Sequence, residues 1–466
     1  MNRKLDILEL ANNLDDSIIY AFKSINDAFR NTHYQDKVYL YGGAVRDILL
    51  GRCPNDLNFV IDGTHNFGLA AKKVAKHIGC DRRGENPIYS DDRESVYLEI
   101  PGVSYPISFE NSKAFLASSV RPDVSTDWRC RDFTVNALYY NISTNRLFDP
   151  SGKGLSDLHN LVIRSTKETT DLTLLESPMR IIRALRMTAY GFSIEKNLWF
   201  SILKRSSLIG KLKKTDIKTE MSMLMVGTKP SEALRRMESS GVLKSIFEDV
   251  YELKSLYYDK NQKKTILAHT YEMVDYVFAI PENRFAALFH EVGANIVELP
   301  SQVDEVSAHT AHIELKNFGF EEDFIDAVSG GILGHGAFRN LTPNGVPTKK
   351  SLKKFVTRFA NSYAIALDLM NAENNLGNTK KKNQVSKIAS AIEKMLDEDE
   401  LENETKVRPK LPLTGDDLME HFDLPKGPHI GHLLKALDVY LQEHPEATKD
   451  ELLIKAALLM EKSVRI

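Results

Sequence analysis

Two neighbouring segments near the N-terminus decide the fold: Tyr39-Leu-Tyr-Gly-Gly-Ala-Val-Arg-Asp-Ile-Leu-Leu-Gly51 and Asn55-Asp-Leu-Asn-Phe-Val-Ile61. The first predicts a strand that runs into a Gly-Gly turn and then a helix, and the second predicts another strand. Glycines at such a turn let backbone N–H groups approach an anion closely, and Arg46 adds a positive charge. This arrangement suits a triphosphate.

The second segment places two polar side chains on one face of its strand. Asp56 and Asn58 lie two residues apart, so in extended backbone both side chains point in the same direction. A paired acidic motif presents two carboxylates to Mg²⁺ in this way. We therefore take these two residues as candidate metal ligands and catalytic residues.

The spacing at which hydrophobic residues recur along the chain changes near residue 150. Before it, short β-rich runs alternate with a helical stretch at Thr64–His77; the runs are Val38–Tyr41, Leu57–Ile61, Val96–Ile100 and Tyr105–Phe109. After about Leu172 the apolar residues recur at helical spacing, in Glu176–Ala189, Pro230–Ser239, Thr265–Val277, Glu282–Phe289 and Gly431–Gln442. The pattern predicts an α+β protein, with a small mixed-sheet head followed by an all-α neck, body and tail.

We expect four domains within this plan. They are a head over residues 1–150, a helical neck over 151–250, a helical body over 251–407 and a helical tail over 408–466. The last boundary follows the acidic run Asp397–Glu404, which is typical of a solvated connection or an exposed helix end.

Composition narrows the class of protein. The 466 residues are 42% hydrophobic and 27% charged, which excludes a disordered tail or a disulfide mini-protein. The net charge is only -3, so a nucleic-acid partner would have to be held by a local patch. Cys53, Cys80 and Cys130 are not spaced like metal ligands, and with no apolar stretch of membrane length we expect a cytoplasmic protein without a signal peptide or membrane span. The sequence leaves the oligomeric state open.

Three ordered blocks of sequence resemble the class II tRNA nucleotidyltransferase and bacterial poly(A) polymerase superfamily. The first holds Gly42–Asp47, Leu49–Gly51 and Asp56–Asn58; the second holds Arg131–Leu138, Phe148–Pro150, Gly154 and Asp157–Leu158; the third holds Glu176–Arg180 with Arg183 and Arg186. The later segments Arg284–His290, Leu413–Leu418 and Gly427–Gly431 look more like the CCA-adding branch than the poly(A)-adding branch.

This resemblance implies template-independent addition of C, C and A to the 3′ end of tRNA, with CTP and ATP as donors. A two-ion Mg²⁺ site at Asp56 and Asn58 would supply the catalytic metal. The resemblance implies nucleotide contacts at Gly43, Arg46, Arg131, Ser177, Arg180, Arg183 and Arg186. It also favours structural roles for Asp132, as an organiser of arginine side chains, and for Asn136, as a polar support.

Two positions depart from the family pattern. Asn58 replaces the second Asp of Asp-x-Asp and lacks its charge, a loss expected to cost on the order of a hundredfold in rate. Ser177 replaces an Asp that accepts a hydrogen bond from the base, and a hydroxyl that can also donate should loosen discrimination. Glu99 or Glu110 could compensate for the lost carboxylate. The alternatives are therefore a weakened or inactive RNA-binding descendant of the family, and a poly(A)-adding enzyme.

Two further features belong to the helical part. A cluster of cations supplies a candidate RNA-binding patch, or else a solvated helix face: Lys204, Arg205, Lys211, Lys213, Lys214 and Lys218. The contexts of His269 and of His290-Glu291 resemble the HD-type metal phosphohydrolase domain, with His335 as a conceivable further ligand. That domain expects His-Asp, so we favour a structural relic and expect no second metal there.

Overall fold

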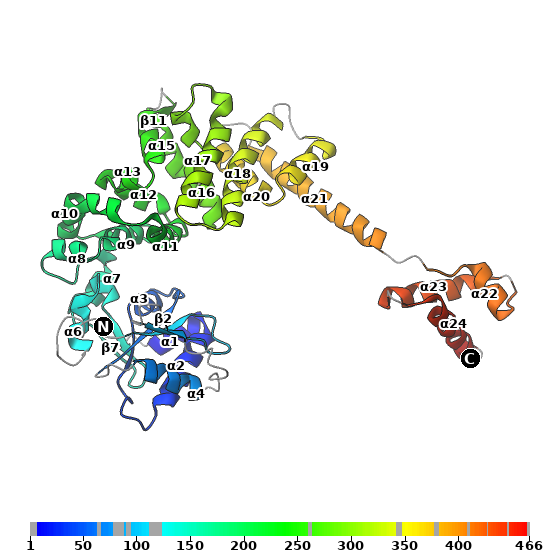
Figure 1. The fold of residues 1–466 in the computed structure, drawn as a ribbon, viewed down its shortest axis with the longest axis horizontal. Helices are drawn as coiled ribbons and strands as arrows, with labels where there is room; N and C mark the ends of the chain where they lie inside the picture. Colours follow the sequence, from blue (N-terminus) through cyan, green and yellow to red (C-terminus); the bar gives the residue numbers. More distant parts are fainter. Residues whose placement is uncertain are drawn as a thin grey trace. The chain divides into compact units, whose positions relative to one another are not determined.

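The computed structural model describes residues 7–62, 67–77, 88–89, 95–110, 124–259, 263–341, 347–376, 382–407, 411–425, 427–444 and 447–463. A mixed sheet with flanking helices forms the N-terminal part, and the remainder is mostly helical (Figure 1). This confirms the predicted α+β fold class. Cys80 and the predicted boundary at residue 408 lie outside the described residues.

Seven strands form the sheet of the head, in the order β3-β4-β5-β2-β1-β6-β7. Strand β2 runs parallel to β5, and the other neighbouring pairs are antiparallel. The predicted strand at Tyr105 begins two residues late, because Pro106 has no N–H to donate to the sheet. The strands are Val38–Tyr41 (β1), Leu57–Ile61 (β2), Ile88–Tyr89 (β3), Ser95–Leu98 (β4), Ile107–Glu110 (β5), Tyr139–Asn141 (β6) and Arg146–Phe148 (β7).

One face of the sheet is apolar. Phe59 of β2 and Phe109 of β5 are fully buried, and their rings stack with centroids 5.6 Å apart. Phe22 of α2 (Asp16–Phe29) meets Phe59 edge-on at 6.2 Å. The neighbouring helices are α1 (Ile7–Leu14) and α4 (Phe67–His77). Burial of these aromatic rings fixes the register of β2 and β5, since a shift by one residue would turn them to the opposite face.

Because successive side chains of a strand point to opposite faces, polar side chains lie on the other face of the sheet. Asn58 and Ser108 are register partners on β2 and β5, and Val60 and Glu110 are the next pair with the same orientation. Tyr41 and Tyr139, on β1 and β6, are also register partners, and their rings stack at 6.0 Å. The apolar contacts on one face therefore position a row of polar groups on the other.

Two short strands and a series of helices follow the head. Strands β8 (Val162–Ile163) and β9 (Ser193–Ile194) pair in parallel. The helices up to residue 252 are α7 (Gly154–His159), α8 (Thr170–Glu176), α9 (Met179–Thr188), α10 (Lys196–Arg205), α11 (Lys214–Met225), α12 (Pro230–Ser240), α13 (Val242–Ile246) and α14 (Glu248–Glu252).

The predicted single helix over Glu176–Ala189 is wrong at its start. Helix α8 ends at Glu176, Ser177 is extended with φ -149°, and α9 begins at Met179. The physical reason is Pro178, whose ring disfavours helical backbone at the preceding residue. The residues that the sequence placed on one helix therefore come from two.

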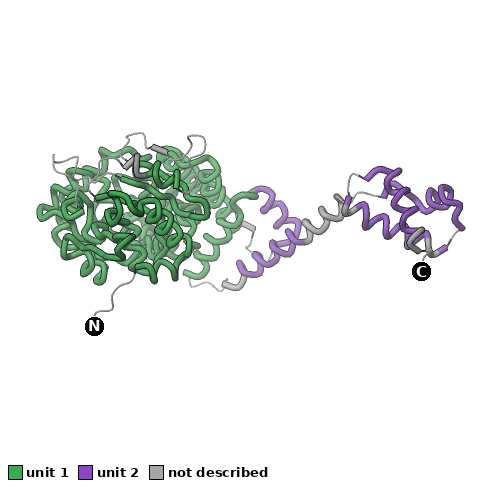
Figure 2. The backbone as a smooth tube through the Cα atoms, turned by 90° about the horizontal axis from the view of Figure 1, so that it is seen from below, with its two compact units in different colours: residues 1–343, 359–382 green, residues 344–358, 383–466 purple. Residues whose placement is uncertain are grey.

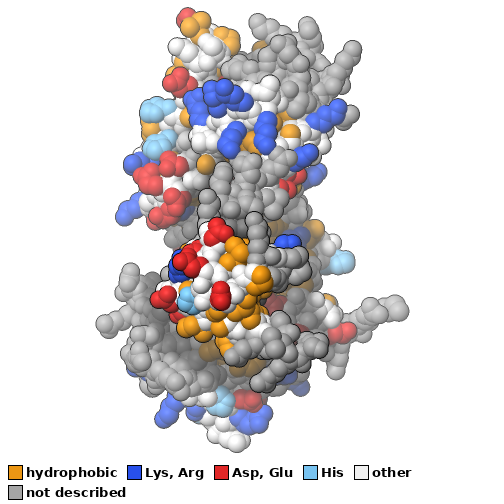
Figure 3. Space-filling view, turned by 90° about the vertical axis from the view of Figure 1, so that its right-hand side faces the viewer, with side chains coloured by type: hydrophobic (Ala, Val, Ile, Leu, Met, Phe, Trp, Pro, Cys, Tyr) orange, Lys and Arg blue, Asp and Glu red, His pale blue; other side chains and the backbone are white. Residues whose placement is uncertain are grey.

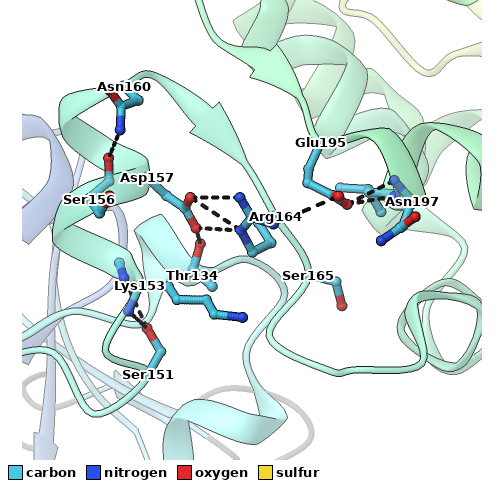
Figure 4. A network of polar contacts seen from close by, with 12 residues as sticks. Thr134, Ser151, Lys153, Ser156, Asp157, Asn160, Arg164, Ser165, Glu195 and Asn197 are labelled. Atoms are coloured by element: carbon cyan, nitrogen blue, oxygen red, sulfur yellow. Dashed lines mark hydrogen bonds and ion pairs between the residues drawn. The ribbon is translucent and has the colours of Figure 1, made fainter.

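A buried carboxylate ties the head to the strands that follow it (Figure 4). Asp157 of α7 accepts hydrogen bonds from the Thr134 hydroxyl at 2.7 Å and from the Arg164 guanidinium at 3.0–3.2 Å. Arg164 also lies 3.7 Å from Glu195, which caps the start of α10. Both carboxylate oxygens of Asp157 thus accept hydrogen bonds, as a buried charge requires.

The chain forms two compact units, residues 1–343 with 359–382 and residues 344–358 with 383–466 (Figure 2). The first unit also holds the two-stranded pair β10 (Tyr257–Asp259) and β11 (Lys264–Thr265), and helices α15 (Ile266–Tyr276), α16 (Pro281–Phe289), α17 (Val303–Asn317), α18 (Glu322–Leu341) and α20 (Tyr363–Leu376). The predicted helices at Pro230, Thr265 and Glu282 are confirmed to within one residue at each end. The four predicted domain ranges stay a prediction.

The second unit is helical. Its helices are α19 (Lys349–Arg358), α21 (Lys382–Val407), α22 (Gly415–Phe422), α23 (Pro428–Glu443) and α24 (Lys449–Ser463). Thr414 and Asp417 form a capping box at the start of α22, and Leu418 and Leu437 lie in a small apolar core. Among the described residues, none of the helices combines the length and apolar character that a membrane crossing requires.

The close packing around Gly154 can be tested by a substitution that adds a methyl group. A Cβ at this position would lie 2.7 Å from the Thr134 carbonyl oxygen and 2.8 Å from a Leu138 methyl group, so Gly154→Ala should lower the free energy of unfolding by about 1–3 kcal/mol. Urea denaturation followed by circular dichroism measures the change. Gly210→Ala is the matched control, because a Cβ there meets nothing within 4 Å. Equal stability of the two variants would contradict the packing.

Candidate nucleotide site

The Gly-Gly turn positions the first cation of the site. Gly42 has φ 76°, which favours glycine, and helix α3 (Gly43–Leu49) begins directly after it. Arg46 on α3 donates to both carboxylate oxygens of Asp47 at 2.8 Å and to Asn136 Oδ1 at 2.6 Å. The guanidinium is 8% exposed, so it is held in place before any ligand arrives.

Asn58 is hydrogen-bonded on both sides of its amide. Its Nδ2 donates to Asp56 Oδ2 at 3.0 Å, and its Oδ1 accepts from the Ser108 hydroxyl at 2.5 Å. Burial raises the pKa of Asp56, the hydrogen bond from Asn58 opposes that rise, and nearby Glu110 and Asp47 add to it. A carboxylate at position 58 would repel Asp56, whereas the amide of Asn58 stabilises the charged form of Asp56.

A second cluster lies beside this pair on the same face. The Glu110 carboxylate accepts a hydrogen bond from the Tyr41 hydroxyl, and Arg131 Nη1 lies 3.8 Å from it. Arg131 is also paired with the fully buried Asp127 at 2.7 Å and stacks over the Tyr41 ring at 3.9 Å. Arg131 is thus largely occupied by protein partners, and the structure places it at the base of the site.

Three arginines that were predicted as nucleotide contacts, Arg180, Arg183 and Arg186, all line this region. Arg180 donates to the carbonyl oxygens of Thr173 and Cys130, both at 3.0 Å, and pairs with Glu176 at 3.2 Å across the break before Pro178. Its guanidinium is thereby fixed between α8 and the head.

Arg183 and Arg186 share one buried acidic partner. Glu220 of α11 accepts from Arg183 Nε at 2.7 Å and lies 2.9 Å from Arg186 Nε. Arg183 Nη1 is also 3.6 Å from Asp132, which accepts from Asn136. Asp132 therefore lies close to an arginine of α9, and Asn136 links Asp132 to Arg46. The organising and supporting roles of these two residues stay predictions.

These groups line one cavity of about 390 Å³. It brings together most of the residues predicted as nucleotide contacts or metal ligands, but Ser177 is not among its lining residues. The residues that the sequence did not single out are Tyr41, Tyr97, Ser108, Glu220 and Met223, and neither their type nor their spacing signals the role. The lining is Tyr41, Gly42, Gly43, Arg46, Asp47, Asn55, Asp56, Asn58, Tyr97, Ser108, Glu110, Cys130, Arg131, Asp132, Asn136, Arg180, Arg183, Arg186, Glu220 and Met223.

The cavity lining holds oxygen atoms of the kind that a divalent cation prefers. Mg²⁺ prefers carboxylate and carbonyl oxygens, which Asp56, Asn58 and Glu110 supply. Burial and neighbouring negative charge disfavour the ionised form of Asp56, and a cation beside it would relieve that cost. A second ion would need a second carboxylate, which Glu110 could provide and Glu99, absent from the lining, could not.

The predicted RNA-binding patch is partly neutralised by protein carboxylates. Lys204 and Arg205 both bond to Asp171 at 2.9 Å. Lys214 pairs with Glu314 at 2.7 Å, and Lys218 lies 3.7 Å from Glu321. The patch therefore presents less free positive charge than its sequence indicates, although Lys211 and Lys213 are exposed.

The histidines with the HD-like context gather inside the helical body. His269, His290 and His335 are all buried, with ring centroids 5.5 and 5.9 Å apart in succession. His269 stacks on Tyr258 at 3.9 Å, and His335 pairs with Glu373 at 2.7 Å. Among the residues that the structure describes, no group of three or more His, Cys, Asp and Glu side chains is arranged to hold a metal ion.

Comparison with known proteins gives two family matches. Residues 38–164 match the family described as the poly A polymerase head domain, and residues 191–253 match a probable RNA- and SrmB-binding site of polymerase A. These two segments of the chain are therefore similar to segments of poly A polymerases. Neither match is an HD domain.

Curated relatives resemble about half of the chain. The multifunctional CCA protein of Xanthomonas campestris is 28% identical over 229 residues, and a tRNA nucleotidyltransferase of Schizosaccharomyces pombe is 28% identical over 262 residues. These alignments cover 47% and 52% of the chain, and they span about half of each relative, 52% and 51%.

Solved structures share the fold of this chain over nearly its whole length. The structure is similar to the Bacillus stearothermophilus CCA-adding enzyme in complex with CTP, with a TM-score of 0.55, 17% identity, and coverage of 97% of this chain and 99% of that one. It is also similar to the Thermotoga maritima CCA-adding enzyme complexed with tRNA, with a TM-score of 0.53, 17% identity, and coverage of 99% and 100%.

The buried histidines make stability depend on pH. Burial lowers the pKa of His269 from 6.5 to about 4, so the unfolded chain binds a proton at a pH where the folded chain does not. Stability is then full above pH 6.5 and is lost as pH falls toward 4, by about 1.4 kcal/mol per pH unit. Thermal unfolding between pH 7 and 5 measures the loss.

His269→Phe keeps a ring against Tyr258 and removes this titration, so its stability should fall less steeply with acidification. The control is His309→Phe at an exposed position, which should retain the wild-type slope. If both variants lose stability at the same rate as the wild type, His269 is not the group that titrates.

Proposed function

We propose that this chain is a template-independent nucleotidyltransferase that adds C, C and A to the 3′ end of tRNA, with CTP and ATP as donors. The observation that supports this most is that one cavity is lined by the Asp56 carboxylate and by the arginines of α3 and α9. Anionic and cationic groups in the same cavity suit a reaction in which a triphosphate must be held while its α-phosphate is attacked.

The chain's own residues would position the donor nucleotide. Arg46 and the Gly42-Gly43 turn would bind the triphosphate, and Arg183 and Arg186 would add positive charge in the same cavity. Arg180, fixed by two backbone carbonyls and Glu176, would present its remaining N–H groups to the base. Positioning of this kind supplies most of the catalysis in phosphoryl transfer.

Asp56, Asn58 and Glu110 are the residues that would hold Mg²⁺. When bound, such an ion would neutralise charge on the triphosphate and favour ionisation of the attacking 3′-hydroxyl. Ser108 can accommodate this, because its hydroxyl can donate to Oδ1 of Asn58 or accept from Nδ2 after the amide turns over. The amide oxygen would then face the cation beside Asp56.

The relatives support the choice of substrates. Their names describe CCA addition and tRNA nucleotidyl transfer, and the similar solved structures hold CTP, ATP or tRNA. The similarity of the C-terminal segments to CCA-adding enzymes makes poly(A) addition the weaker hypothesis. Incorporation of long A-only tails would favour it.

A second candidate function follows from the Asn58 contacts. In the structure the amide nitrogen, not the oxygen, faces Asp56. A chain in which that arrangement persists would bind nucleotide and RNA but transfer slowly or not at all, as a weakened descendant of the family. The two candidates differ in one measurable property, the rate of incorporation.

A substitution that restores the second carboxylate distinguishes the two candidate functions. With tRNA lacking its terminal CCA, Mg²⁺ and labelled CTP and ATP, Asn58→Asp should raise the incorporation rate on the order of a hundredfold, because it returns a stabilising charge to the site. Asn197→Asp adds the same charge at an exposed position and should have no effect.

Wild-type incorporation at a rate that Asn58→Asp does not improve would contradict the weakened-site hypothesis. tRNA binding without incorporation, in both the wild type and Asn58→Asp, would contradict the transferase. Asp56→Asn should abolish any incorporation observed.

Ser177 gives a separate prediction about nucleotide choice. Ser177→Asp would provide an acceptor that cannot donate, and a hydrogen bond to a charged group contributes about 1.5–3 kcal/mol. The preference for CTP and ATP over UTP and GTP should rise roughly tenfold or more, measured as ratios of kcat/KM. Ser239→Asp, at an exposed position outside the cavity, is the control. Unchanged ratios would contradict a role for residue 177 in base selection and would agree with its position outside the cavity lining.

A further inference from the structure

Tyr97 of β4 presents an exposed aromatic ring to the nucleotide cavity. It is 47% exposed, although Val96 and Leu98 on either side of it in the chain are buried. Its register partner on β5 is Ser108, whose side chain is too small to cover a tyrosine ring. In the part of the chain that the structure describes, no hydrogen bond or ring contact holds the side chain of Tyr97. The packing of the head therefore gives no reason for an aromatic residue at this position.

The other tyrosine of the cavity lining is already occupied by protein groups. Tyr41 is 4% exposed, its ring stacks on that of Tyr139, and the Arg131 guanidinium lies over it at 3.9 Å. The Tyr41 hydroxyl donates a hydrogen bond to Glu110. Of these two tyrosines, Tyr97 is thus the one whose ring remains available to a ligand.

The strand order fixes where Tyr97 lies relative to the residues that would hold Mg²⁺. Tyr97, Ser108 and Asn58 are successive register partners on β4, β5 and β2, so their side chains share the polar face of the sheet. Neighbouring strands lie about 4.8 Å apart, which puts the backbone of Tyr97 about 10 Å from that of Asn58. The Gly42-Gly43 turn follows β1, which borders β2 on the opposite side. Asn58 therefore lies between the turn and Tyr97.

This order fits the two substrates of the proposed reaction. In phosphoryl transfer the attacking and leaving oxygens lie roughly in line across the phosphorus atom. With the triphosphate at the Gly42-Gly43 turn, pyrophosphate leaves on the side of β1, and the attacking 3′-hydroxyl approaches from the side of β5 and β4. The nucleotide that carries this hydroxyl would then lie beside Tyr97.

The chemistry of an aromatic ring suits the acceptor base better than the donor base. The donor base has to be selected, which requires directional hydrogen bonds. The acceptor base changes after each addition, so its contact has to tolerate any base, and stacking does so because every base has a π-face. Exposed cations, which gather over one part of the surface in Figure 3, serve a different purpose, since such side chains mainly contact phosphates.

We propose that Tyr97 binds the acceptor RNA by stacking its ring on the 3′-terminal base. The stacked base holds the 3′-hydroxyl toward the carboxylates of Asp56 and Glu110. This proposal rests on the proposed function, because it takes an RNA 3′ end as the acceptor. Stacking needs the ring and not the hydroxyl, so phenylalanine should serve at position 97.

The first measurement does not depend on turnover. A tRNA that ends in a single-stranded C followed by 2-aminopurine is titrated with the full-length chain in the absence of CTP and ATP, and stacking on an aromatic ring quenches the fluorescence of 2-aminopurine. The wild type and Tyr97→Phe should quench it, and Tyr97→Ala should not. The matched control is Tyr20→Ala on α2, a tyrosine that is 49% exposed and outside the cavity lining, which should quench as the wild type does.

The second measurement is the incorporation of labelled CTP into tRNA lacking its terminal CCA. Tyr97→Ala should lower kcat/KM for the tRNA roughly tenfold to a hundredfold, the factor expected from the loss of one stacked base. The KM for CTP should stay that of the wild type, which shows that the cavity is intact. An acceptor whose terminal nucleotide lacks its base should react slowly with the wild type, and no more slowly with Tyr97→Ala.

Three results would overturn the proposal and leave the proposed function standing. They are quenching by Tyr97→Ala equal to that of the wild type, an equal loss of kcat/KM on the intact and the abasic acceptor, and a raised KM for CTP, which would assign the ring to the donor base. Quenching that Tyr97→Ala loses, without incorporation by the wild type or by Asn58→Asp, would support the acceptor contact and contradict the transferase. A wild type that binds no tRNA would overturn both.

Discussion

The site depends on one buried carboxylate that holds two arginines at once. Glu220 fixes Arg183 and Arg186 from a helix that contributes no other charge to the cavity lining. From Arg183 the polar contacts continue through Asp132 and Asn136 to Arg46, so the cations of α9 and α3 belong to one connected network. A network of this kind holds like charges close together before the ligand is present, and the ligand then meets a site whose reorganisation is complete.

The charges beside strands β2 and β5 explain why the amide of Asn58 is important for this side of the cavity. Glu110 is already engaged by Tyr41 and Arg131, and Asp56 is partly buried beside it. With a carboxylate at position 58, three acidic groups would crowd one strand pair, a state that metal ions normally relieve. With an amide, the wall is stable without them, because Asn58 donates to Asp56 and accepts from Ser108. An asparagine at position 58 therefore leaves less negative charge on this strand pair than an aspartate would.

Much of the fold and site could be predicted from local sequence, and the rest could not for identifiable reasons. Period-two alternation around Asp56 and the Gly-Gly turn are local signals, and the structure brings those residues to one cavity. Ser108 and Glu220 are distant in sequence from their partners, and only strand pairing and helix packing bring them close. The break between α8 and α9 at Ser177 is not visible in the helical spacing of the apolar residues, because it is caused by the effect of Pro178 on the backbone of the preceding residue.

Although the net charge is near neutral, the chain holds two kinds of cation that differ in their surroundings. The arginines in the cavity are paired with carboxylates, and Arg46 and Arg131 are also buried, so their positions are fixed by the protein. The cations of α10 and α11 lie outside the cavity, where Lys204 and Arg205 pair with Asp171 and surface charge is screened within about 10 Å at ordinary salt. The first arrangement suits a small ligand whose orientation matters, because several fixed donors can bind it at once. Screened and mobile surface cations cannot orient a ligand in this way.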